Sequence, residues 1–181
     1  MSDFLNNDRT TRFGWDETFM NLALLVSQRT SCKHHLVGVV YVDKNKRIVS
    51  LGYNGPVSGD YNCIEVGCAK IDGDPVTKKV QKCRGMHAEI NGIINSENTA
   101  RLQGATLYTS VLCCWDCFKA ISNAGIKEVV YFQEYKRIKK GGEATEEENE
   151  IWDLGKKLGI KIRKYDGEVH LKDTKYNKRE K

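Results

Sequence analysis

Residues 105–132, ATLYTSVLCCWDCFKAISNAGIKEVVYF, decide the fold of this chain. The apolar start at 105–109 predicts a short strand, and the apolar run at 128–132 predicts another. Between them, 114–123 predicts a helix that Gly125 closes, because glycine readily adopts the left-handed conformation common just after a helix. A strand, a helix and a strand in this order are typical of a sheet that carries helices on its faces.

Patterns on either side of this segment predict the remaining elements. Helices are predicted at 15–29, 87–96 and 143–158, and strands at 36–42, 48–53 and 160–164. The turn residues 43–46 join the first two of these strands as a hairpin. After that hairpin, strands and helices alternate along the chain. The sequence therefore predicts an α/β fold in which one sheet is covered by helices on both faces.

Composition and charge are those of one globular domain. The 181 residues are 40% hydrophobic and 29% charged, and no apolar run approaches the roughly 20 residues that span a bilayer. We expect a disordered or partly ordered N-terminus at 1–14, a single domain at 15–165 and a basic tail at 166–181. The net charge of +5, which is 29 minus 24, suits an anionic small substrate. Its excess lies at 136–140 and 172–181, where we expect a solvated terminus rather than nucleic-acid binding.

Seven cysteines occur in a chain whose N-terminal residues lack the apolar core of a secretion signal. We therefore expect a cytoplasmic location with no membrane partner. In such a reducing compartment disulfides are rare. Clustered cysteines with nearby histidines then indicate metal ligands.

Two short motifs carry the chemistry: His-Ala-Glu at 87–89 and Cys-Trp-Asp-Cys at 114–117. Cys114 and Cys117 are three residues apart at a predicted helix start, so both sulfurs face the same way, and a helix N-terminus favours thiolates. One histidine nitrogen and two sulfurs leave the fourth position of a tetrahedral zinc open for water. Glu89 lies near the metal without being a ligand and can move the water's proton to a substrate. Each motif alone is weak, but together they match the signature of zinc nucleobase deaminases.

Longer stretches of the chain resemble the deoxycytidylate deaminases, within the cytidine deaminase superfamily. The matching stretches are RTSCKHHLVGVVYV (29–42), IVSLGYNG (48–55), MHAEINGI (86–93) and the segment 105–132. The resemblance runs from about Trp15 to Tyr135. It implies a three-layer α/β/α cytidine-deaminase-like fold with a five-stranded mixed sheet. It also implies zinc-dependent hydrolytic deamination of dCMP to dUMP and ammonia, which supplies dUMP for thymidylate synthesis.

The same resemblance assigns roles to single residues. It makes His87, Cys114 and Cys117 the ligands of the catalytic zinc and Glu89 the proton shuttle. The substrate-binding candidates that it implies are Asn54 at the sugar and base edge, Asn91 near the sugar hydroxyl, the backbone around Ser110 for the substrate amine, and Tyr135 against the base.

Regulation and assembly are also implied by the resemblance alone. The deoxycytidylate deaminases are homohexamers that dCTP activates and dTTP inhibits, usually with Mg²⁺. The GYNG loop is similar to the family segment at the regulatory site, so Gly52, Tyr53 and Gly55 are the candidate residues there.

The remaining cysteines lie outside the two motifs. The family usually has proline where this chain has Cys113, and we expect Cys113 not to be a ligand, because adjacent residues rarely bind one tetrahedral ion. Some family members hold a second, structural zinc near the start of the insert at 54–84. Cys32 and Cys63 match its positions, and Cys68 and Cys83 can complete it. His34 or His35 can replace one of these four, or several of the cysteines are ordinary buried thiols.

Three rival functions remain open at the level of sequence. A tRNA adenosine deaminase uses the same two motifs, and the basic tail would suit it. A free-nucleoside deaminase would not need the long insert. A non-catalytic, zinc-stapled nucleic-acid-binding module would have no use for the carboxylate of Glu89 beside the metal.

Overall fold

The computed structural model describes residues 12–134 and 147–171. The predicted contact of Tyr135, the basic stretch at 136–140, the first residues of the predicted helix 143–158 and the tail beyond 171 lie outside these residues. Within them, no helix is both long enough and apolar enough to span a membrane.

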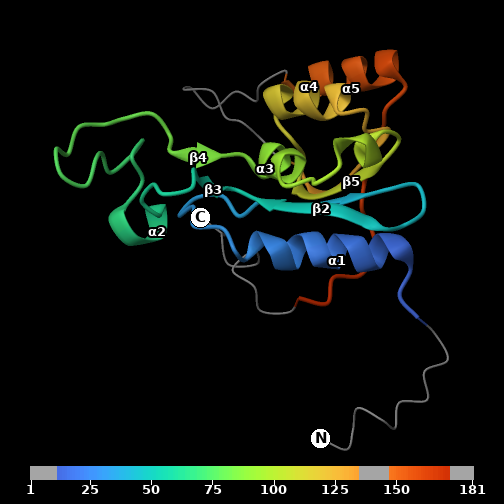
Figure 1. The fold of residues 1–181 in the computed structure, drawn as a ribbon, viewed down its shortest axis with the longest axis horizontal. Helices are drawn as coiled ribbons and strands as arrows, with labels where there is room; N and C mark the ends of the chain where they lie inside the picture. Colours follow the sequence, from blue (N-terminus) through green and yellow to red (C-terminus); the bar gives the residue numbers. More distant parts are fainter. Residues whose placement is uncertain (1–11, 135–146, 172–181) are drawn as a thin grey trace, which may run out of the picture.

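Figure 1 shows helices on both sides of a central sheet. The helices are α1 (Trp15–Ser27), α2 (Cys63–Val66), α3 (Ala88–Ile94), α4 (Trp115–Asn123) and α5 (Glu147–Leu158), with one 3-10 turn at Thr99–Leu102. The strands are β1 (Gly38–Val42), β2 (Ile48–Tyr53), β3 (Gly55–Pro56), β4 (Gly85–Met86), β5 (Thr106–Val111), β6 (Glu128–Gln133) and β7 (Lys161–Lys164). Each predicted helix and strand is therefore present, with ends shifted by a few residues in the described parts.

The main sheet has five strands in the order β2-β1-β5-β6-β7. β1 pairs antiparallel with β2, which confirms the predicted hairpin, and also antiparallel with β5. β5, β6 and β7 are parallel to one another. α1 covers one face, and α3, α4 and α5 lie on the other (Figure 1). The predicted three-layer α/β/α fold with a five-stranded mixed sheet is confirmed.

β1 is buried along its whole length, as its valine-rich sequence predicts. Because side chains alternate across a strand, Val39 and Tyr41 point to the α3 and α4 side, and Val40 and Val42 point to the α1 side. The register between β1 and β2 shifts between Tyr41 and Val42. Each face of the sheet therefore has its own apolar cluster, and the cluster under α3 and α4 supports the candidate site.

The insert at 54–84 forms an arm beside this core (Figure 1). It holds α2, and β3 at its start pairs with β4 just beyond its end. Gly67, at φ +92°, follows α2, and the carboxylate of Asp72 accepts a 2.7 Å hydrogen bond from the Cys68 N–H. Hydrogen bonds rather than a core of its own therefore order much of the insert.

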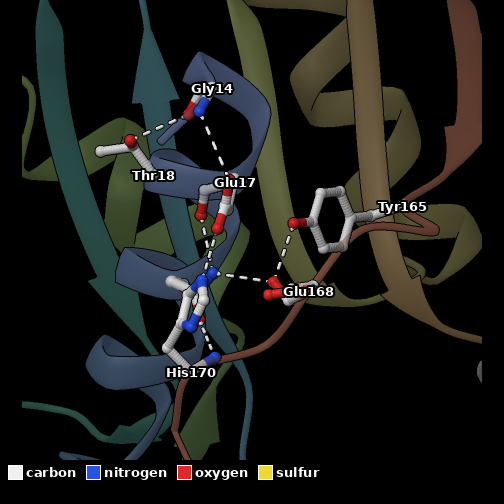
Figure 2. Close-up of polar contacts among 7 residues, drawn as sticks. Gly14, Glu17, Thr18, Tyr165, Glu168 and His170 are labelled. Carbon is white, nitrogen blue, oxygen red and sulfur yellow. Dashed lines mark hydrogen bonds and ion pairs between the residues drawn. The ribbon is translucent and has the colours of Figure 1, made fainter. Parts of the chain in front are cut away.

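The segment after β7 runs back along α1 (Figures 1 and 2). The Asn21 side chain accepts a 2.7 Å hydrogen bond from the His170 N–H and donates a 3.1 Å bond to the Glu168 carbonyl. The Tyr165 hydroxyl donates a 2.9 Å bond to the same carbonyl (Figure 2). Val169 and Leu171 pack against the apolar cluster on the α1 side. Residues 166–171, predicted as the start of the tail, thus continue the folded domain.

Candidate active site and metal centre

Two helix starts meet on the face of the sheet opposite α1. His87 is the N-cap of α3, and Cys114 is the N-cap of α4. The His87 Nδ1 lies 3.2 Å from the Cys117 Sγ and 3.4 Å from the Cys114 Sγ. The structure therefore brings the three predicted ligands, here called the catalytic group, within 4.8 Å of one another.

The donor atoms of the catalytic group fit a tetrahedral zinc ion. With Zn–S at about 2.3 Å and Zn–N at about 2.0 Å, tetrahedral angles place N and S about 3.5 Å apart, close to the observed separations. Cys114 and Cys117 are buried, whereas His87 is exposed. Three protein ligands leave one position for water or substrate, as in catalytic zinc sites.

The two thiols are coupled through a shared hydrogen bond. The pKa of Cys114 is lowered to about 4, mainly by the hydrogen bond from Cys117; burial opposes this shift, and hydrogen bonding to His87 adds to it. The same bond raises the pKa of Cys117. Zinc binds thiolates, so a zinc ion bound to both sulfurs would take the place of the thiol proton.

Glu89 lies in the first turn of α3 and is only 4% exposed. Burial raises its pKa, against a backbone hydrogen bond and the neighbouring His87, both of which lower it. A buried carboxyl group with a raised pKa beside metal ligands suits a general acid and base. Sequence reasoning placed Glu89 beside the metal, but only the structure shows how completely it is enclosed.

A cavity of about 130 Å³ lies beside the candidate ligands and Glu89. His87, Glu89 and Cys114 line it on one side, and Asn54 lies in its wall. The Asn54 Oδ1 accepts bonds from the Val37 N–H and the Thr30 hydroxyl, both at 2.8 Å. Its Nδ2 donates to the His35 carbonyl at 2.9 Å. Three hydrogen bonds thus hold this amide in a fixed orientation at the edge of the cavity.

Two other predicted substrate residues do not line this cavity. The Ser110 hydroxyl accepts a 3.0 Å bond from the Gly38 N–H and so ties β5 to β1, while the next residues, Val111 and Leu112, form cavity wall. Asn91 donates a 2.9 Å bond to the Tyr53 carbonyl and lines a second cavity. Their predicted contacts with substrate stay predictions.

The second cavity, of about 610 Å³, lies beside the GYNG loop. Two of the predicted regulatory residues, Tyr53 and Gly55, line it together with Arg29. The third, Gly52, instead faces α3, where an added Cβ would clash with the Ala88 carbonyl and lie 2.5 Å from the Gly92 nitrogen. Gly52 therefore allows β2 and α3 to pack closely.

The four cysteines of the predicted second zinc site, Cys32, Cys63, Cys68 and Cys83, all line the first cavity. The Cys32 Sγ accepts 3.4 Å hydrogen bonds from the N–H groups of His34 and His35, and the Cys83 Sγ accepts a 3.3 Å bond from Gly85. No three of these sulfurs and imidazoles lie within 4.8 Å of one another among the described residues. Cys113 is 2% exposed and belongs to the apolar cluster under α3 and α4.

Two residues that the sequence analysis did not single out touch this region. The Tyr41 hydroxyl donates a 2.9 Å bond to the Glu89 carbonyl, and burial raises the pKa of Tyr41 well above its ordinary value. Arg84, whose side chain is 7% exposed, donates a 3.2 Å bond to the Gly67 carbonyl. One sequence signal was available for Tyr41, because a tyrosine within a buried valine-rich strand needs a partner for its hydroxyl.

A second group of three metal-binding side chains occurs in the described residues: Glu17, Glu168 and His170, here called the α1 group. His170 forms an ion pair with Glu17 (Figure 2). Its ring also stacks on Phe13, with ring centroids 4.4 Å apart. The other Glu17 oxygen accepts a 3.4 Å bond from the Gly14 N–H at the start of α1. Within this group, Glu17 and His170 are therefore already paired with each other.

Comparison with known proteins identifies the family. The sequence model of the cytidine and deoxycytidylate deaminase zinc-binding region matches residues 13–133. This chain belongs to that family. A deoxycytidylate deaminase of Mus musculus is 34% identical over 134 residues, which cover 74% of this chain and 73% of that protein. The family's zinc-binding region includes both motifs of the catalytic group.

Two further relatives differ in how much of their own length this chain covers. A deoxycytidylate deaminase of Schizosaccharomyces pombe is 36% identical over 135 residues, 74% of this chain but only 41% of that protein. The chain thus spans less than half of that relative's length. The crystal structure of dCMP deaminase from the cyanophage S-TIM5 in complex with dCMP and dUMP has a TM-score of 0.63 at 27% identity, and the match covers 86% of this chain and 99% of that one.

Proposed function

We propose that this family member is a zinc-dependent hydrolase that converts dCMP to dUMP and ammonia. The observation that carries the proposal is the catalytic group with the buried Glu89 beside it in one cavity. The similarity to deoxycytidylate deaminases supports the substrate, and the S-TIM5 protein was crystallised with dCMP and dUMP. The dUMP formed would be used for thymidylate synthesis in the cytoplasm.

The residues divide the chemistry among them. A zinc ion held by His87, Cys114 and Cys117 would supply a Lewis acid that lowers the pKa of a bound water. Glu89, enclosed and close to these ligands, takes up one proton from the attacking water and delivers it to the ring nitrogen, and then passes the second proton of that water to the amine, which leaves as ammonia. Asn54 offers a fixed amide at the cavity edge for the sugar and base. The backbone around Ser110 would accept a hydrogen bond from the substrate amine.

To test this proposal, the zinc-loaded protein is incubated separately with dCMP, deoxycytidine and a tRNA stem-loop. Ammonia release and the cytosine-to-uracil absorbance change are measured. Turnover of dCMP alone supports the proposal, and turnover of deoxycytidine or of tRNA adenosine replaces it with one of the rival enzymes. No turnover of any substrate by the zinc-loaded protein would contradict all three enzymes and favour the non-catalytic nucleic-acid-binding module.

We propose further that the second cavity is the regulatory site for dCTP and dTTP, with Mg²⁺, in a homohexamer. Its size and its lining by Tyr53, Gly55 and Arg29 support binding of an anionic nucleotide. The test measures dCMP turnover with each triphosphate in wild-type protein and in Arg29→Ala, and the mass of the assembly by light scattering. Activity that responds to neither triphosphate, or a monomer throughout, contradicts this part of the proposal.

A second, structural zinc is also proposed, held by Cys32, Cys63, Cys68 and Cys83. Two features support it: all four cysteines line one cavity, and backbone N–H groups already point at the sulfurs of Cys32 and Cys83. Binding would draw these sulfurs closer together than they lie now. Elemental analysis should then find two zinc ions per chain, and Cys63→Ser should remove one while the catalytic ion stays. A single ion in the wild-type protein would contradict the second site.

A further inference from the structure

Tyr41 reaches from the centre of the sheet to the helix that carries Glu89. Its side chain is 0% exposed, and its hydroxyl donates a 2.9 Å hydrogen bond to the backbone carbonyl of Glu89. The surrounding cluster is apolar and includes Val39 and Ala88. Burying a hydroxyl without a hydrogen-bond partner is unfavourable, so this bond fixes where the phenol must lie relative to α3.

Helix α3 packs closely against the Tyr41 ring at Gly92, which has no side chain. A Cβ added to Gly92 would lie 2.5 Å from the Tyr41 Cε2 and 3.0 Å from the Val39 Cγ2. The Gly92 carbonyl accepts a 2.7 Å bond from the Ser50 hydroxyl on β2. Ring, hydroxyl and glycine together thus leave α3 little freedom to slide or turn on the sheet.

We propose that Tyr41 is a positioning residue that holds the first turn of α3, and with it the Glu89 carboxyl, at its place beside the zinc ligands, and that Gly92 is glycine to make room for the Tyr41 ring. The inference rests on the proposed deaminase function only for its effect on rate. It differs from simple core filling, since a phenylalanine would fill the same space without holding the Glu89 carbonyl.

The chain supplies a matched control in Tyr108. This tyrosine is also 0% exposed, lies on the neighbouring strand β5 and uses its hydroxyl in a 2.6 Å bond to Asp16. It belongs to the apolar cluster on the α1 face, away from the catalytic group. Tyr41→Phe and Tyr108→Phe therefore remove the same atom from two buried rings on opposite faces of the sheet.

The first experiment compares steady-state kinetics on dCMP for these two variants, each checked for zinc content. We expect Tyr41→Phe to lower kcat about 10-fold with KM within about 2-fold of wild type, because small displacements of catalytic groups act mainly on the reaction step. Tyr108→Phe should keep kcat within about 2-fold and lower only the thermal midpoint. Equal kcat in wild type and Tyr41→Phe would overturn the proposal. A wild-type protein inactive on every substrate would instead overturn the proposed function.

A second measurement does not depend on activity. Amide hydrogen exchange in the first turn of α3 should rise about 10-fold in Tyr41→Phe and stay unchanged in Tyr108→Phe. Gly92→Ala should lower kcat, and adding Tyr41→Val should recover part of that loss by removing the clashing ring, although Tyr41→Val alone lowers kcat. Unchanged exchange in Tyr41→Phe would overturn the positioning role of Tyr41, and a double variant worse than Gly92→Ala would overturn the assignment of Gly92 as room for the Tyr41 ring.

Discussion

The catalytic group and the α1 group each bring three potential metal ligands within 4.8 Å, yet their surroundings differ. In the catalytic group the two sulfurs are buried at the start of α4, where the pKa of Cys114 is lowered, so a thiolate is available to a cation. In the α1 group the Glu17 and His170 side chains are 24% and 36% exposed and already form an ion pair. Glu17 also lies at the positive end of α1, which favours its carboxylate and disfavours a cation. Proximity of ligands is therefore not sufficient for a metal site.

The largest expected contrast concerns the carboxylates of the two regions. Glu89→Gln should lower turnover of dCMP about 1000-fold while zinc stays bound, since an amide cannot carry the proton. Glu17→Gln, at the α1 group, should leave turnover within about 2-fold. Steady-state rates with zinc content measured by elemental analysis decide the matter, and near-wild-type turnover in Glu89→Gln would remove Glu89 from the mechanism.

Metal content gives the next contrast. Cys117→Ser should lose the catalytic zinc ion, because the remaining two ligands bind zinc far more weakly. His170→Ala should keep the full zinc content of the wild-type protein. Both variants are dialysed against the same zinc buffer and analysed side by side. A zinc ion lost from His170→Ala would show that the α1 group does bind metal.

The contribution of the ion pairs at the α1 end of the domain to the unfolding free energy should depend on pH. Burial alone would raise the pKa of Asp16, but hydrogen bonds from Tyr108 and Arg163 outweigh it and lower the pKa. A carboxyl group whose pKa is lowered by folding stabilises the folded protein at pH values above its ordinary pKa of about 4. This stabilisation is lost as the pH falls through the lowered pKa of the folded state.

Asp16→Asn should therefore cost less than about 1 kcal/mol of unfolding free energy at pH 7, since Asp16 is partly exposed. The difference from wild type should shrink below about pH 4. Denaturant unfolding across a pH series measures it, and a difference that does not change with pH would show that charge is not the cause.

The smallest expected effect is on the unfolding free energy of variants in the α1 group, and it shows whether this group acts as an ion pair or as a metal site. His170→Ala should lower the unfolding free energy by about 0.5–1 kcal/mol through loss of the Glu17 pair and the Phe13 stack. Glu168→Gln should leave it within about 0.3 kcal/mol, because the group is held through the Glu168 carbonyl rather than its carboxylate. Equal losses in both variants, present only with added zinc, would indicate shared metal binding.

Sequence patterns predicted the elements of the main sheet because each one has a local cause. The valines of 36–42 and 128–132 favour buried strands, and Gly125, at φ +85°, ends α4 as expected. The insert was less predictable, since its order depends on single hydrogen bonds such as that of Asp72 with the Cys68 N–H. The packing of residues 166–171 on α1 depends on partners about 150 residues away, such as Asn21, which no local pattern reports.

The sequence by itself determined the sheet with helices on both faces and the chemical types of the candidate ligands, because strand and helix periodicity and the spacing within 87–89 and 114–117 are local properties. The family followed from the resemblance of longer stretches of the chain. Only the tertiary structure decided that these two motifs meet within 4.8 Å and that Glu89 is enclosed beside them. It also decided that Asn91 lines the second cavity and that Tyr41 holds the Glu89 carbonyl. The physical reason is that burial and contact depend on how α3 and α4 pack across the sheet, and that packing joins residues far apart in the chain.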